Sequence, residues 1–248
     1  MLLTALDPRD GLLSLGLGGV ALVWCWRQGL QLEQALIVAG GRAILQLCAL
    51  GLGLTLVLSF QSPWVNVFAI VGVALLWGVK LHQSFDRRLP IWRITGILLR
   101  SLALPWIYGI LVVVRPVTGF ASPEAVILAW AGLGGVVQLG ERAGQTLLQV
   151  LKRERADLET RLSLGASPHQ AIAPHRRQVL GQIIGAQVQT WGQVGLLGLP
   201  LFLAGLMLAG TDGVTALGYQ VLLLALVLLA GVVAATAIVD ALSRSWEL

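Results

Sequence analysis

Apolar residues along this chain fall into long continuous runs, and short polar segments separate them. A helix that crosses a bilayer needs roughly 20 apolar residues, within a range of about 17–25. The runs lack the alternation of apolar and polar positions that a membrane β-barrel strand shows. Because backbone groups inside a bilayer must pair with one another, the pattern predicts an all-α, polytopic transmembrane helix bundle. About seven spans are expected, over residues 11–26, 35–60, 63–79, 91–114, 123–139, 179–209 and 214–241.

Composition places the whole chain in a membrane. Of its 248 residues, 56% are hydrophobic and 12% are charged, whereas soluble domains carry about 25% charged residues. The mean hydropathy is +0.82. We therefore expect a single transmembrane domain over residues 1–248. A multi-pass protein of the plasma membrane is expected, which in a bacterium is the inner membrane.

Basic residues set the expected orientation, because short cytoplasmic loops are enriched in lysine and arginine. If residues 140–178 are cytoplasmic, all but Arg9 and Arg115 of the 17 basic residues lie on or near that side. The net charge of +5 then follows from topology, so no nucleic-acid partner is expected. With about seven spans, the N-terminus is expected outside and the C-terminus inside.

The longest hydrophilic stretch, residues 140–178, is expected to form a cytoplasmic helical extension of the membrane domain. Strong helix formers without proline predict that the fifth membrane helix continues to about Leu162. Gly165 then ends that helix. Ser167 and Pro168 fit the N-cap and the first position of a short second helix.

Residues 159–171, here named the coupling segment, resemble the short cytoplasmic helix that permeases of ABC transporters present to their ATPase. In many importers an acidic residue precedes a glycine by six positions, as Glu159 precedes Gly165. A glycine permits the sharp reversal between two helices, and flanking charges orient a partner. The alternative is an ordinary amphipathic loop with a glycine C-cap. The residues expected to couple to an ATPase are Glu159, Leu162, Leu164, Gly165, Ala166, Pro168 and Ala171, with Leu162, Leu164, Ala166 and Ala171 as their apolar face.

Four stretches occur in a set order, namely residues 41–47 (GRAILQL), 162–171 (LSLGASPHQA), 194–200 (VGLLGLP) and 209–212 (AGTD) leading to Tyr219 and Gln220. Together they resemble the Fet-type iron-export ABC transporter permease family, which includes plant aluminium-tolerance permeases. The resemblance covers roughly residues 35–235. It implies a permease that moves a metal ion, iron-like, or a small solute outward. The resemblance also implies a separate cytosolic ABC ATPase that binds ATP and Mg, so no cofactor is expected in this chain, and we hypothesise that the permease is a homodimer.

The chain departs from that family at several points. Leu201-Phe202-Leu203 stands in place of Gly-Met-Met, Asp212-Gly213 in place of Asp-Pro, and a Gly-Asn pair is missing from the fifth span. Methionine and asparagine side chains are potential metal or polar contacts. Their loss leaves the substrate open, and no metal-ligating residue is assigned.

Polar residues at membrane depth are costly, and they usually face other helices or a water path. In the sixth span, glutamines at positions 178, 182, 189 and 193 share one helical face. We hypothesise that the deeper ones line a translocation path, while interhelical hydrogen bonding is the alternative. Arg42 can bind an anionic substrate, pair with Glu141 or reach lipid phosphate. The expected path residues are Arg42, Gln46, Gln182, Gln189, Gln193 and Gln220.

Catalytic chemistry is not expected of this chain. It has no glycine-rich lysine loop of the Walker type, so it is not the ATPase itself, and no nucleophile–base pair marks it as an enzyme. His82, His169 and His175 are expected to be solvated, because no cysteine completes a zinc site. An ion-coupled secondary transporter is an alternative that requires paired acidic residues at mid-membrane. A non-transporting regulatory membrane subunit is the other.

Overall fold

The structure, a computed structural model, describes residues 19–20, 22–29, 33–60, 62–116, 119–194 and 200–245. Within these ranges the chain is helical and has no strand, which confirms the predicted all-α class. The principal elements are α2 (Glu33–Ser59), α3 (Pro63–Ser84), α4 (Ile91–Tyr108), the π-helical η1 (Gly109–Val114), the 3-10 turn η2 (Gly119–Ala121), α5 (Pro123–Arg153), α6 (Arg155–Ser163), α7 (Pro168–Gly192), α8 (Leu201–Leu208) and α9 (Gly213–Ser245).

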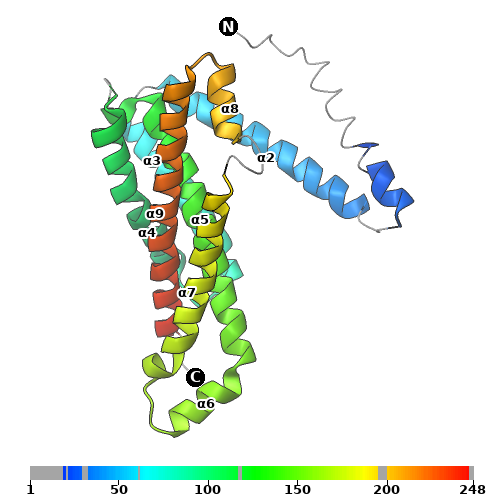
Figure 1. Cartoon of the computed structure of the whole chain (residues 1–248), viewed down its shortest axis with the longest axis vertical. Coiled ribbons are helices and arrows are strands. Elements are labelled where there is room, and N and C mark those ends of the chain that lie inside the picture. The colour runs from blue at the N-terminus through cyan, green and yellow to red at the C-terminus, as the bar shows by residue number, and fades with distance from the viewer. Residues whose placement is uncertain are drawn as a thin grey trace.

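Helices α3, α4, α5 and α9 form a bundle in which α5 and α9 pack together along much of their length. Helix α7 lies beside α5 and α9, whereas α2 leans away from the bundle (Figure 1). The chain reverses direction between α3 and α4, between α6 and α7, and between α8 and α9. One end of the bundle carries α6, the connection between α3 and α4, and the last turn of α9, and we call it the hairpin end.

Glycines allow α5 and α9 to approach each other closely. A Cβ added to Gly140 would come within 2.6 Å of Ile238 Cδ1, one at Gly135 would overlap Val227, and one at Gly231 would overlap Leu139. Since lipid tails are as apolar as the side chains, close van der Waals packing between small residues is what holds membrane helices together. Glycine therefore allows close packing along the interface of α5 and α9.

Five helices in the described part of the chain are long and apolar enough to cross a membrane, so the protein is a multi-pass membrane protein. They are Gln34–Ser59, Pro63–Ser84, Ile91–Val114, Pro123–Arg153 and Gly213–Ser245. They match five of the predicted spans. The predicted span at 11–26 lies largely outside the described residues. The predicted span at 179–209 divides into the end of α7 and the short α8, with residues 195–199 outside the described ranges. The count of seven and the orientation stay predictions.

Candidate functional site

The hydrophilic stretch forms a helical hairpin that projects from the hairpin end of the bundle (Figure 1). The predicted single extension to about Leu162 is wrong in one respect, because the helix breaks at Glu154 into α5 and α6. Glu154 has φ −101° and ψ 27°, and its N–H still bonds the carbonyl of Val150 at 2.8 Å. The break turns α6 away from the axis of α5, and α6 then leads into the reversal toward α7.

Gly165 makes the reversal itself, as predicted. Its φ is +90°, in the left-handed region that side chains with a Cβ rarely adopt. Its N–H donates to the carbonyl of Leu162 at 2.9 Å, and the N–H of Ala166 donates to the carbonyl of Arg161 at 3.1 Å. This pair of bonds is a Schellman motif, which satisfies the last carbonyls of a helix. A Cβ at Gly165 would have no heavy atom within 4 Å. The turn therefore depends on its backbone angles and hydrogen bonds and not on packing around Gly165.

Ser167 and Pro168 begin the next helix as the sequence predicted. The Ser167 side chain accepts the N–H of Gln170 at 3.3 Å, and the Gln170 side chain accepts the N–H of Ser167 at 2.9 Å. This capping box fixes the start of α7, with Pro168 in its first turn. The predicted short helix is instead the first part of a 25-residue helix that ends at Gly192. One continuous helix, with Pro174 in its interior, therefore joins the reversal to the membrane region.

The coupling segment presents one large apolar side chain to solvent. Leu164 is 82% exposed. Leu162 is half-buried against the core, and Ala171 is 1% exposed. The structure thus differs from the expected shared apolar face, because α7 turns Ala171 toward its own bundle. The remaining predicted residues are at the surface or partly covered: Glu159, whose carboxylate accepts from Arg155 Nε at 2.8 Å, Ala166, which is half-buried, and Pro168, which is exposed.

His175 joins the two arms of the hairpin, a role that sequence reasoning missed. Its Nδ1 lies 2.8 Å from a Glu154 carboxylate oxygen, and its Nε2 lies 3.6 Å from a carboxylate oxygen of Asp157. The side chain is 6% exposed, so the expectation of a solvated histidine is wrong here. His82 is also partly buried, with Nδ1 2.6 Å from the carbonyl oxygen of Leu89. Glu154 and His175 come together only in the folded hairpin, so the sequence alone did not predict this pair.

Ion pairs tie the hairpin end together. Lys80 Nζ lies 3.2 Å from the Glu141 carboxylate. Glu141 therefore pairs with Lys80 and not with Arg42, which was one of the alternatives for Arg42. Lys152 donates to Asp86 at 2.7 Å, and this bond holds the pKa of the Asp86 carboxyl below its usual value. The first contact links α5 to α3, and the second links α5 to the connection between α3 and α4. Exposed ion pairs contribute little to stability individually. We therefore interpret these two pairs as contacts that orient the ends of the helices.

The six predicted path residues lie on three separate helices, and the structure does not gather them into one site. Arg42 and Gln46 are exposed on α2. Gln220 on α9 is 8% exposed, and its side-chain oxygen has no hydrogen-bond partner. Gln182 and Gln189 are exposed on α7, and Gln193 is exposed directly after the end of that helix. Among the residues that the structure describes, no cluster of three or more His, Cys, Asp and Glu side chains could hold a metal ion.

A bundle of long apolar helices with a charged helical hairpin at one end defines a multi-pass membrane protein. The family model described as "Uncharacterised protein family (UPF0014)" matches residues 10–246, and the chain belongs to this family. It is 31% identical to the UPF0014 membrane protein slr1647 of Synechocystis sp., over 98% of this chain and 95% of that protein. This assignment confirms the resemblance noted in the sequence.

Two further relatives are less similar, and the printed name of the first describes a role. The chain is 27% identical to the "Probable iron export permease protein FetB" of Escherichia coli, over 85% of this chain and 80% of that protein. It is 24% identical to the UPF0014 membrane protein STAR2 of Oryza sativa, over 83% of this chain and 71% of that protein. No solved structure matches the chain significantly.

Proposed function

We propose that this protein is the membrane permease subunit of an ATP-driven exporter, and that a metal ion or small solute is its cargo. The observation that carries the proposal is the hairpin, in which a Schellman turn places the exposed Leu164 at the tip. A hinge of this kind suits docking into a groove of a separate cytosolic ATPase of the ABC class. The name of the Escherichia coli relative supports iron as the cargo to test first.

Movement of the hairpin can reach the membrane region through two continuous helices. α5 spans 31 residues and α7 spans 25, and both lead from the hairpin end toward the opposite end of the bundle. Because His175 and Glu154 join their adjoining ends, a push on the hairpin displaces α5 and α7 together. The ATPase must bind the two permease states with different affinity, since otherwise its cycle would drive nothing.

Leu164→Asp should weaken binding of the ATPase by about tenfold to a hundredfold. Burying a leucine contributes about 1.5–3 kcal/mol, and each 1.4 kcal/mol is a factor of about ten in the dissociation constant. The measurement is the dissociation constant between the detergent-solubilised chain and the ATPase that co-purifies with it. Val214→Asp is the matched control, because Val214 is also 82% exposed but lies at the other end of the bundle. The proposal fails if no ATPase co-purifies, or if Leu164→Asp binds it like the wild type.

We propose further that two copies of the chain face each other through α7. Its exposed face carries Gln182, Gln189 and Gln193, with Gly185 between them. No hydrogen bond links these three amides to the described part of the same chain, so bonding within one chain does not account for them. Amides at membrane depth are costly against lipid, and amides from two copies can bond each other and enclose a path between them.

Gln189→Leu combined with Gln193→Leu should reduce transport by about tenfold or more, the effect of losing about 1.4 kcal/mol of stabilisation along the path. ATPase binding should remain, because the hairpin is unchanged. Transport of ferrous iron into inverted vesicles is the readout, beside ATP hydrolysis. Gln187→Leu is the control, since Gln187 is half-buried on the opposite face of α7. Normal transport by the double variant at normal expression would remove this face from the path.

A further inference from the structure

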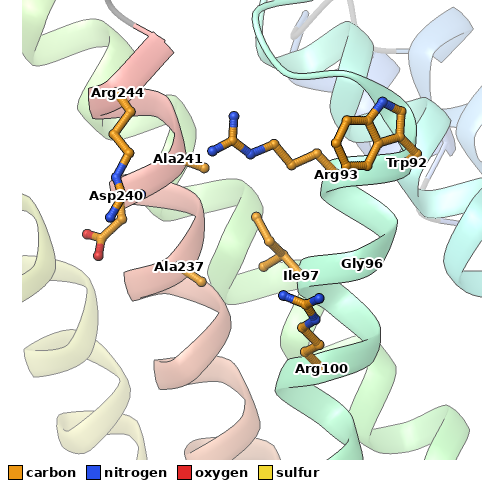
Figure 2. A pocket seen from close by; sticks show the side chains of 9 residues that line it. All are labelled: Trp92, Arg93, Gly96, Ile97, Arg100, Ala237, Asp240, Ala241 and Arg244. Atoms are coloured by element: carbon orange, nitrogen blue, oxygen red, sulfur yellow. The ribbon is translucent and has the colours of Figure 1, made fainter.

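Three arginines line a pocket between α4 and α9 at the hairpin end (Figure 2). Its volume is about 370 Å³. Arg93 and Arg100 lie about two turns apart in α4, and Arg244 comes from the last turn of α9. In Figure 2 the Arg93 side chain extends from α4 toward α9. The Arg100 side chain points toward the end of α4 that carries Arg93. The Arg244 side chain runs along α9 toward Asp240, so three cationic side chains from two helices line the same pocket.

The pocket is positively charged even though it contains an aspartate. Asp240 belongs to its lining, but its carboxylate is 2.7 Å from Arg176 Nη2, which neutralises it. Among the described residues, no carboxylate lies within ion-pair distance of Arg93, Arg100 or Arg244. Three cationic side chains that line one pocket attract a negatively charged ligand to it.

An apolar groove continues from this pocket along α4. It has a volume of about 520 Å³, and Arg100 lines both the pocket and the groove. The other lining residues of the groove are Ala103, Leu104, Ile107, Tyr108, Leu111 and Val112. They extend along α4 into η1, away from the hairpin end. A cationic pocket thus continues into an apolar groove that runs along a membrane-spanning helix.

We propose that the pocket and groove together bind an anionic phospholipid. Arg93 and Arg244 hold the phosphate, Arg100 reaches it from the mouth of the groove, and an acyl chain lies against Leu104 and Ile107. Basic pockets between membrane helices bind the head groups of such lipids. Trp92, which is 74% exposed beside Arg93, has the position of an interfacial anchor. A soluble anion or an acidic peptide would explain the arginines and leave the groove without a role.

Gly96 leaves room for the head group, because a Cβ at this position would have no heavy atom within 4 Å. The site uses neither the coupling segment nor the glutamine face of α7. The inference therefore holds or fails separately from the proposed transport function.

Native mass spectrometry of the delipidated protein in detergent tests the proposal. With dioleoyl phosphatidylglycerol and dioleoyl phosphatidylcholine added in equal amounts, the wild type should retain the anionic lipid preferentially. Arg93→Gln combined with Arg244→Gln should lower its affinity about 25-fold, since each arginine near a membrane surface contributes about fivefold. Arg153→Gln combined with Arg177→Gln is the control. It removes the same charge from exposed positions at the hairpin end and should leave binding unchanged.

A second variant separates a lipid from a free phosphate. Ala103→Trp keeps every charge and fills the groove, so it should lower retention of phosphatidylglycerol while the protein still elutes as a folded species. Glycerol 3-phosphate at the same concentration should not displace the lipid. The proposal is overturned if both lipids are retained equally, if the two arginine pairs behave alike, or if Ala103→Trp has no effect. Displacement by glycerol 3-phosphate overturns it as well.

Discussion

Valine in place of Gly165 should uncouple transport from ATP hydrolysis, while the protein still inserts, folds and binds the proposed ATPase. Gly165 has φ +90°, and its turn depends on two backbone hydrogen bonds to Leu162 and Arg161. A left-handed backbone costs an ordinary side chain about 1–2 kcal/mol, and a β-branched side chain more. No neighbour lies near enough to clash with the new side chain. The cost therefore falls on the angle between α6 and α7, and the core is left as it was.

The measurement is the ratio of substrate moved to ATP hydrolysed in reconstituted vesicles, which should fall by about tenfold or more for Gly165→Val, the equivalent of about 1.4 kcal/mol. Gly165→Asn should retain more transport, because asparagine tolerates left-handed angles better than other residues. If Gly165→Val keeps the wild-type ratio, the hinge has no part in coupling.

Gly210 provides a matched control at the opposite end of the bundle. Its φ is +96°, and its N–H donates to the carbonyl of Met207 in the same kind of turn, between α8 and α9. A Cβ there would also have no close neighbour. Gly210→Val thus carries the same backbone cost without touching the hairpin, and it should keep the ratio of transport to hydrolysis. An equal loss in both variants would mean that strain alone, and not coupling, is responsible.

Local features of the hairpin could be predicted from the sequence because short-range chemistry determines them. Glycine alone adopts the angle at position 165 without strain, and serine followed by proline is a common helix start. The capping box at Ser167 needs only Gln170, three residues further along. The apolar runs likewise predicted α2, α3, α4, α5 and α9, since bilayer thickness sets the length of a span.

Features that depend on distant residues could not be predicted. The pairing of His175 with Glu154 requires that two helices fold back on each other, and Glu141 bonds Lys80 from another helix. The packing of the bundle also decides which side of a helix is buried. Ala171 was expected to face a partner, but it is buried within the chain. Gathering of the path residues was expected from their shared chemistry. Within one chain the path residues stay apart, because α2 leans away from the bundle while α7 packs against α5 and α9.

Alanine in place of Gly144 should lower stability sharply, although the change adds only one methyl group. Its Cβ would overlap the ring of Phe85, with Phe85 Cζ at 2.7 Å and Leu242 Cδ1 at 3.1 Å. The ring has no room to move, because Phe85 and Leu89 are fully buried and Lys152 holds the adjoining Asp86. Overpacking of this kind costs about 1–3 kcal/mol. In a chain of this size the melting temperature falls by about 2–4 °C per kcal/mol.

Thermal unfolding in detergent tests this prediction, with Gly134→Ala as the control on the same helix. A Cβ at Gly134 would meet nothing within 4 Å, and alanine is a better helix former by about 1 kcal/mol. Gly134→Ala should therefore match or exceed wild-type stability. Adding Phe85→Leu to Gly144→Ala should cost less than the two single changes together, because the shorter side chain makes space for the new methyl group. Equal stability of Gly144→Ala and Gly134→Ala would show that α5 does not rest against the connection between α3 and α4.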